Sequence, residues 1–194
     1  LNDPSLEDVF QRMATALDVQ NLNLNIYKID AVNGLAAANS QIYITQGFIN
    51  KYVAGDVTAT ELASVVAHEL GHVALGHTRR RMIDFSGQNA MRTALAITLN
   101  RFIPFIGPWI ANLAVTIVAA RMSRKDELEA DAYATALMIK SGLGARSQKD
   151  LLSKLDKITG VGGGTPAWFL SHPKTKDRLR AIEQNELKWT GELS

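Results

Sequence analysis

The residues of this chain best suited to chemistry lie in the segment from His68 to His72, which reads His-Glu-Leu-Gly-His. On a helix, residues four apart share one face, so both imidazoles can bind the same zinc ion. Glu69 lies beside the first histidine, and its carboxylate can reach a metal-bound water without binding the metal, as a general base does. Burying three such side chains in a core helix without a metal would be costly. The spacing therefore favours a hydrolytic zinc centre over chance.

Two histidines leave a catalytic zinc one protein ligand short. At about 100° per residue, His77 lies across the helix from His68 and should not be the third ligand. Carboxylates further along the chain are the remaining option. Glu127 and Asp131 share a helix face, whereas Glu129 points elsewhere. We expect Glu127 to bind the metal and Asp131 to hold the imidazole of His68 in its tautomer; the alternative is a solvated helix start.

The elements that position these residues are mostly helices. Helical spacing of apolar residues predicts helices over residues 4–17, 58–77, 123–141, 148–158 and 175–187. The helices at Thr58 and Ser123 each begin with a capping-box pattern. Alternation predicts strands near Asn23–Ile29 and Gln41–Thr45, with a loop between them. The fold class is thus α+β and mainly helical, in a single domain over residues 1–194 with a small N-terminal sheet.

An uncharged run extends from Phe102 to Ala120. Proline and glycine at positions 104, 107 and 108 break it, and the piece that follows spans roughly 18 Å of helix, short of the roughly 30 Å hydrocarbon core. A single membrane span is therefore not expected. The pattern predicts an apolar helical hairpin over about 88–121, inserted between the ligand motifs. Its 91–120 part could pack on the domain, touch a membrane surface or bind a partner.

Composition narrows the possible partners and chemistry. The apolar share of 46% is that of an ordinary folded protein. A net charge of +2 gives no concentrated positive field, so nucleic acid is not an expected partner. The absence of cysteine excludes disulfides, thiolate ligands and cysteine nucleophiles. The chain opens at Leu1 without a methionine or an apolar leader, which suggests a processed or trimmed chain.

Several motifs in order resemble the gluzincin metalloendopeptidases grouped with HtpX, BepA and the CAAX prenyl protease. The matching segments are Asn33–Gly47, His68–His72, Ser123–Asp131 and Ser171–Pro173 followed by Arg178. The resemblance implies a zincin-like fold with one Zn²⁺ ion and Glu127 as third ligand. Integral members of that family carry membrane helices between the second histidine and the glutamate, where this chain has the predicted hairpin.

The resemblance also implies a role for the second predicted strand. In gluzincins an edge strand above the zinc pairs with extended substrate, and Ile42, Tyr43, Ile44 and Thr45 would supply it here. An ordinary half-buried strand fits the same alternation. Ala38, Asn39 and Ser40 stand where the family has Pro-Gly-Gly, so the turn before the strand departs from the family pattern.

His172 and Arg178 belong to the last matching motif. We expect His172 to lie within reach of the zinc, either donating to the oxyanion of the tetrahedral intermediate or binding zinc in a resting state. The alternative is a surface histidine beside a proline. Arg178 is expected to hold its helix by a salt bridge rather than to meet substrate.

These observations predict a zinc metalloendopeptidase that cleaves internal peptide bonds of unfolded or extended protein substrates. Zinc would polarise the scissile carbonyl, while Glu69 takes a proton from the attacking water and passes it to the leaving amine. The alternative is a chaperone-like or assembly-factor module with a latent or structural zinc site. The expected location is the bacterial cell envelope, periplasmic or membrane-associated.

Overall fold

The chain divides into two compact units. The computed structural model describes residues 3–22, 24–36, 41–102, 107–159, 168, 172 and 176–191. The first unit contains Leu1–Leu75 and Glu127–Ser194, and the second contains Gly76–Asp126. The first unit is therefore discontinuous in sequence and holds every residue expected at the metal site. The single domain over 1–194 stays a prediction, as does the hairpin insertion, whose expected bounds of 88–121 lie inside the second unit.

The chain begins with the predicted helix, α1 (Pro4–Ala16). Asp3 caps it, because its carboxylate accepts hydrogen bonds from the backbone N–H groups of Ser5 and Leu6. The buried face of α1 carries Leu6, Val9 and Met13. This face packs on α3 and forms one wall of the core.

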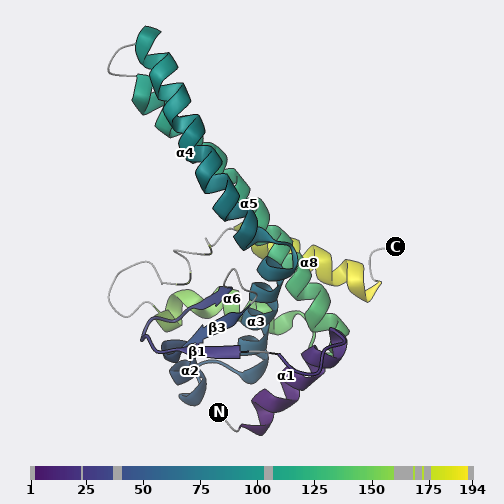
Figure 1. The fold of residues 1–194 in the computed structure, drawn as a ribbon. Coiled ribbons are helices and arrows are strands. Elements are labelled where there is room, and N and C mark those ends of the chain that lie inside the picture. The colour runs from purple at the N-terminus through teal and green to yellow at the C-terminus, as the bar shows by residue number, and fades with distance from the viewer. Residues whose placement is uncertain are drawn as a thin grey trace. The chain divides into compact units, whose positions relative to one another are not determined.

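Three short strands follow, β1 (Leu24–Tyr27), β2 (Gly34–Ala36) and β3 (Ile42–Thr45). Their order in the sheet is β1-β3-β2, with β1 parallel and β2 antiparallel to β3. The two predicted strands correspond to β1 and β3 and are confirmed. β2 lies where a loop is expected, because three residues are too few to show a period of two. α3 packs against β2 and β3, and Figure 1 shows β3 beside it.

The strand order corrects one expectation from the sequence. Ile42, Tyr43, Ile44 and Thr45 form the central strand, with β1 paired along one side and β2 along the other. The backbone of β3 is therefore engaged on both sides and cannot be an edge that receives substrate. In the described sheet, the edges are β1 and β2.

The helix that carries the histidines is α3 (Ala59–Ala74), reached through α2 (Gln46–Val53). Its predicted capping box is confirmed, because Thr58 and Glu61 each accept a hydrogen bond from the other's backbone N–H. From Glu61 to His72 only Leu70 is not fully buried. α3 ends short of the predicted His77, since Gly76 adopts a left-handed φ of 67°.

The core of the first unit lies between α1, the sheet, α3 and the helices after Glu127. Met13, Phe48, Val66 and Ile182 are fully enclosed there. Burying side chains of this size stabilises the fold by roughly 1.5–3 kcal/mol each relative to leaving them exposed. The helices that complete this unit include α6 (Arg146–Thr159) and α8 (Lys176–Thr190), close to their predicted bounds.

Two long helices differ from the prediction. α4 is His77–Phe102 and α5 is Gly107–Lys140, so the predicted helix start at Ser123 is wrong. The capping-box pattern lies inside continuous α5, and Asp126 contacts Arg80 (3.4 Å) instead of capping a helix. Among the described residues, none of the helices has both the length and the apolar content needed to cross a bilayer. In the apolar piece after the break, residues 109–120, nearly all side chains lie outside the described part of the chain.

Candidate metal centre

The centre begins with α3, which presents His68, Glu69 and His72 in the interior of the first unit. All three residues are at most 3% exposed. One helical turn separates the two imidazoles, whose ring centres lie 4.8 Å apart with the Nε2 atoms at 3.1 Å. The sequence spacing therefore produces a pair of nitrogen donors at one point, as a shared metal requires.

Helix α5 brings Glu127 to the same point because small residues let it approach α3 closely. A Cβ atom on Gly71 would lie 3.0 Å from both the Cα and the carbonyl oxygen of Ala130. At this separation, Glu127 Oε2 lies 3.3 Å from His68 Nε2, and Oε1 lies 3.4 Å from His72 Nε2. The structure thus brings together the three residues expected to bind metal.

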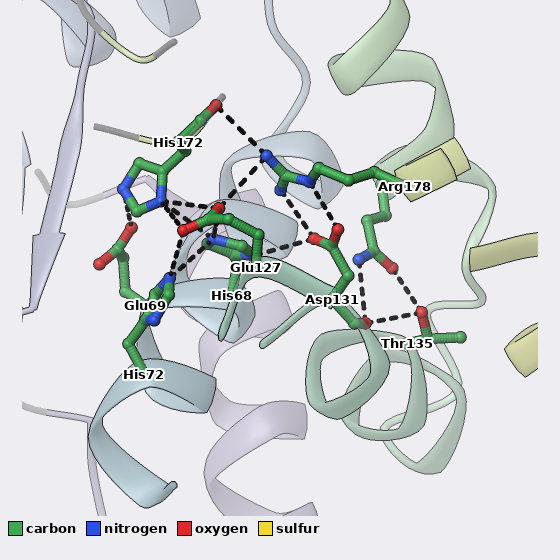
Figure 2. Close-up of polar contacts among 9 residues, drawn as sticks. His68, Glu69, His72, Glu127, Asp131, Thr135, His172 and Arg178 are labelled. Carbon is green, nitrogen blue, oxygen red and sulfur yellow. Dashed lines mark hydrogen bonds and ion pairs between the residues drawn. The ribbon is translucent and has the colours of Figure 1, made fainter. Parts of the chain in front are cut away.

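A fourth donor comes from His172, far away in the sequence. Its Nδ1 atom lies 3.3 Å from His68 Nε2 and 3.1 Å from Glu127 Oε2. Its Nε2 atom lies 3.2 Å from Glu69 Oε1. Figure 2 shows the imidazole between the two carboxylates, directed into the cluster. His172 therefore lies beside the residues that are expected to bind metal.

The donor set fits zinc in both chemistry and spacing. His68, His72, Glu127 and His172 each offer one ligand atom, all within 4.8 Å of one another. A tetrahedral zinc with bonds of roughly 2.0–2.1 Å to nitrogen and oxygen places its donors about 3.3–3.4 Å apart. The His68–Glu127 and His72–Glu127 separations of 3.3 and 3.4 Å match that value.

Asp131 and Arg178 hold the first histidine in place. Asp131 Oδ1 lies 2.9 Å from His68 Nδ1. An ionised carboxylate only accepts, so His68 donates from Nδ1 and leaves the Nε2 lone pair facing the cluster. Arg178 binds Asp131 through two nitrogens, at 2.6 and 2.8 Å. Asp131 thus lies where the sequence places it, and Arg178 makes salt bridges inside the protein.

Arg178 also ties the donors to one another. One of its terminal nitrogens, Nη1, lies 3.3 Å from Glu127 Oε2 and donates to the backbone oxygen of His172 at the same distance. The guanidinium therefore contacts the Asp131 carboxylate, the Glu127 carboxylate and the segment that carries His172 (Figure 2). Its fork of donors suits this task better than the point charge of a lysine.

Burial and charge together set the protonation of the cluster. Burial alone would lower the pKa of His172, but hydrogen bonds with Glu127 and Glu69 outweigh it and raise that pKa to about 9. Burial alone would raise the pKa of Glu69, yet its hydrogen bond with His172 holds that pKa below the usual range. The pKa of Glu127 is lowered for the same reason, by hydrogen bonds with three imidazoles. Both carboxylates are thus ionised, and a metal would compete with the proton on His172.

Three residues near the centre are not identified from the sequence. The indole of Trp168 stacks on the imidazole of His172, with ring centres 4.4 Å apart. Thr135 and Gln148 form hydrogen bonds that help to hold the backbone at Asp131. Gln148 donates to the Asp131 backbone oxygen and accepts from the Thr135 hydroxyl. An aromatic residue four positions before His172 is a weak signal. The two polar residues give none, because only the fold shows that they are buried together.

Some residues considered in the sequence analysis lie away from the donor atoms. His77 is in the second unit, 3.9 Å from Asp126, as its exclusion from the ligand set implies. The edge strand β2, and not the central strand β3, approaches Glu69 through Gly34. A Cβ atom on Gly34 would lie 3.4 Å from Cγ of Glu69 and 2.8 Å from Val65. Ser171, Pro173 and the glycines at 160–164 fall outside the described residues.

Comparison with known proteins agrees with this geometry. The chain matches peptidase family M48 over residues 1–186. It is 28% identical over 177 residues to metalloprotease LoiP of Escherichia coli (strain K12), covering 91% of this chain and 68% of that protein. It is 29% identical over 162 residues to metalloprotease YcaL of the same organism, covering 83% and 61%.

A more distant similarity extends to a eukaryotic protein. The chain is 24% identical over 153 residues to mitochondrial metalloendopeptidase OMA1 of Arabidopsis thaliana, covering 79% of this chain and 29% of that protein. The chain thus spans about two thirds of the two bacterial relatives and less than a third of this one.

Proposed function

This chain belongs to peptidase family M48, a family of zinc metalloproteases, and from that premise we propose that it cleaves internal peptide bonds of extended or unfolded polypeptides. The observation that carries the proposal is the meeting of His68, His72 and Glu127 at one buried point with Glu69 beside it. The word endopeptidase in the name of one relative agrees with cleavage inside a chain. The resemblance to the gluzincin family is confirmed by the match.

We propose that His68, His72 and Glu127 hold one zinc ion. Bound there, zinc supplies a Lewis acid that polarises a carbonyl and makes water more acidic. The three side chains come from α3 and α5, which pack through Gly71 and Ala130, so the protein rather than the ion sets their spacing. Asp131 fixes the tautomer of His68 and keeps its donor atom unprotonated.

Glu69 has the environment of a general base. Its carboxylate is buried, and its pKa is held low enough for it to be ionised near neutral pH. It lies at the edge of the ligand group, 3.2 Å from His172 Nε2. We propose that Glu69 takes the proton of the attacking water and then returns it to the leaving amine. General-base groups of this kind typically contribute roughly 10²–10⁴ in rate.

The substrate segment is proposed to lie along β2. This strand is an edge of the described sheet, and Gly34 brings its backbone against Glu69 without a side chain between them. An extended peptide pairing with β2 would gain main-chain hydrogen bonds and little dependence on side-chain identity. This assignment replaces Ile42–Thr45, whose strand is central.

His172 is proposed as an exchangeable fourth ligand that keeps the site at rest. Its Nδ1 atom lies among the donor atoms, where water and substrate would otherwise bind. In the other version, His172 moves aside and donates to the oxyanion. The position of Nδ1 favours the resting-state version. It also gives some support to the rival function, a module with a latent zinc site, because four protein ligands leave no open position.

The function is tested by separating the base from a ligand. Glu69→Gln should retain zinc and lose digestion of casein, whereas Glu127→Gln should lose zinc as well. Elemental analysis measures the metal, which should be one equivalent, and gel electrophoresis measures digestion. A Glu69→Gln protein without zinc beside a Glu127→Gln protein with zinc would reverse the assigned roles. Retained zinc with no cleavage of any unfolded protein by the wild type would favour the rival.

Replacing His172 by alanine tests the two versions of its role. If His172 occupies the open position, His172→Ala should raise turnover of casein, since the position is freed. If it serves the oxyanion, turnover should fall by roughly 10²–10³ with zinc affinity nearly unchanged. Unchanged turnover would exclude both versions.

Location and membrane contact stay predictions. The name of one relative places it in mitochondria, so similarity alone does not fix a compartment. We propose the bacterial envelope, as the family resemblance suggests, and peripheral contact through residues 91–120. Recovery of the chain from cells only with detergent would show stronger membrane attachment than peripheral contact.

A further inference from the structure

A large hollow lies in the first unit between α1 and the sheet, separate from the metal centre. Its volume is about 600 Å³, in the range of small-molecule and peptide pockets. One wall is α1, with Leu6, Phe10 and Ala14, and the facing wall includes Leu24 and Ile26 of β1. None of the four metal-binding candidates lines it.

The lining is apolar with one charge. Ile44, Ile49 and Leu62 close the hollow on the inside, while Gln11, Asn21 and Asn25 stand at its rim. Glu7 is the only charged residue among those that line it. Glu7 forms no ion pair with any described residue, whereas its neighbour Asp8 pairs with Arg12 at 3.7 Å. A ligand that fills the hollow would thus be mostly apolar and would carry a positive charge near Glu7.

The hollow opens beside an edge strand. β1 pairs with β3 along one side only, and no described strand borders its other side. Two of its residues are apolar and largely exposed, Ile26 at 46% and Tyr27 at 50%. An unpaired edge with exposed apolar side chains is a template for a further strand. Such a strand would run beside β1, and every second side chain would face the side of the sheet on which Leu24 and Ile26 line the hollow.

We propose that the outer edge of β1 and this hollow together bind an extended polypeptide segment that has apolar residues at alternate positions and one lysine or arginine. Main-chain hydrogen bonds to β1 would hold the segment, and every second side chain would point into the hollow. The basic residue would pair with Glu7. The site would therefore select segments by two properties, the alternation of apolar residues and the presence of one positive charge.

The geometry favours a peptide over the other occupants. A free fatty acid or similar small apolar molecule would use the hollow but leave the edge of β1 unused, and its carboxylate would face Glu7. A second copy of this chain would have to insert a strand of its own. An extended segment alone satisfies the edge, the hollow and the charge at once.

Binding of such a segment does not require hydrolysis. It would nevertheless affect catalysis, a consequence that rests on the proposed function. One part of a long polypeptide would be held at β1 while another part lies at β2. Two linked contacts raise the effective concentration of the scissile segment. Loss of the β1 contact should therefore raise KM for long unfolded proteins and leave KM for short peptides unchanged.

The experiment uses the full chain with Glu69→Gln, so that the probe is not consumed. The probe is a fluorescein-labelled decapeptide of alternating leucine and serine with one lysine, and binding is measured by fluorescence anisotropy. One control peptide has the same composition with its leucines in a block. A second has glutamate in place of lysine. We expect both controls to bind more weakly than the alternating, basic probe.

Two pairs of variants locate the site. Ile26→Asp should weaken probe binding by roughly tenfold or more, because it buries a charge under the peptide. Glu7→Lys should weaken it by roughly fivefold, the scale of a rim ion pair turned into repulsion. The matched control for Ile26→Asp is Val53→Asp, at a residue that is 69% exposed and lies outside the hollow. The matched control for Glu7→Lys is Glu183→Lys, at an exposed position of α8. Both controls should bind the probe as the parent does.

Four outcomes would overturn the proposal. The first two are equal binding of the alternating and block peptides, and equal binding of the probe by all variants. The third is displacement of the probe by a fatty acid that binds more tightly than any peptide. The fourth is a concentration-dependent dimer of the chain that dissociates in Ile26→Asp. Because the probe is read in an inactive background, a failed proposed function leaves this result intact. Unchanged circular dichroism of each variant shows that it folds.

Discussion

The surroundings of the two edges of the sheet, β2 and β1, differ in how tightly they are filled. Beside the metal centre, added methyl groups on Gly34 and Gly71 would lie within about 3 Å of neighbouring atoms. Beside α1, a hollow of about 600 Å³ stands open. The same small unit thus contains a region with little spare volume, a hollow of about 20 Å³ beside His68 and Asp131, and a region with much more.

The difference follows from what each region does. Donor atoms that must meet within a few tenths of an ångström need neighbours that cannot move, and close packing supplies this. A surface that accepts varied segments needs room and an unpaired backbone instead. The comparison predicts that substitutions in the filled region lower stability, zinc affinity or activity, while those in the hollow cost no stability.

The largest expected effect belongs to Asp131→Asn in the filled region. The change leaves Arg178 buried without its bidentate partner, which should destabilise the fold by about 3 kcal/mol. It also removes the acceptor for His68, so zinc affinity should fall roughly 10–100-fold. Urea unfolding and competition with a zinc chelator measure the two losses. Wild-type stability in this variant would show that Arg178 relies on Glu127 instead.

The pH dependence of stability should change in the same variant. The pKa of Asp131 is lowered in the fold, chiefly because its hydrogen bond and charge interaction with Arg178 outweigh burial. Its contribution is therefore present above its unfolded pKa, about 3.9, and is lost as pH falls toward the folded value. Between pH 5 and 3 the wild type should lose stability more steeply than Asp131→Asn. Parallel acid limbs would contradict this.

A smaller loss is expected from Gly71→Ala. The new Cβ would meet the backbone of Ala130, which cannot rotate away, so α5 must shift relative to α3. Overpacking of this kind typically costs about 1–3 kcal/mol, of which helix propensity returns about 1 kcal/mol. Glu127 would move from the two histidines, lowering zinc affinity. Gly87→Ala is the control, since nothing lies within 4 Å of its added methyl.

Gly34→Ala should reduce activity more than stability. Its Cβ would press on the side chains of Val65, Trp168 and Glu69, which can yield by small rotations. We expect a loss of about 1 kcal/mol or less in stability, because flexible side chains rather than backbone are displaced. Casein turnover should fall clearly, since Glu69 and the β2 edge both move. Equal loss of stability and turnover would show that the glycine serves folding alone.

The smallest expected effect comes from a substitution in the hollow, and it is a gain of stability rather than a loss. Gln11→Leu adds apolar surface to a wall of the hollow on an exposed part of α1. Filling of this kind commonly stabilises a protein by about 0.5–2 kcal/mol, and leucine favours helix slightly more than glutamine. Thermal unfolding should show a small rise in Tm with unchanged zinc content. A loss of stability would mean that the region is as tightly filled as the metal centre.

The sequence predicts the parts of the fold that depend on local pattern. The zinc helix, its capping box at Thr58 and the strands β1 and β3 follow from spacing over a few residues. Two errors have a common cause. The capping pattern at Ser123 lies inside α5, and the expected edge strand is central, because tertiary contacts decide whether a local signal is used.

The site shows the same division. Helical spacing suffices to place His68 and His72 on one face, since i, i+4 geometry is fixed within one helix. Glu127 lies on another helix, so its meeting with them depends on the close packing of Gly71 on Ala130. Spacing alone places Asp131 beside Glu127, but its bond to Arg178 joins α5 to α8. Trp168, Thr135 and the hollow depend on how segments distant in sequence pack together. No pattern within one segment contains that information.

The first unit is interrupted by Gly76–Asp126, which lies between the histidines of α3 and Glu127 of α5. Closing a loop costs entropy that grows only with the logarithm of its length, about 0.6 kcal/mol for each doubling. The length of this interval is thus nearly neutral for the free energy of assembling the metal ligands. A folded insertion of almost any size can occupy it, so the interval is free to acquire a task of its own while the centre stays unchanged.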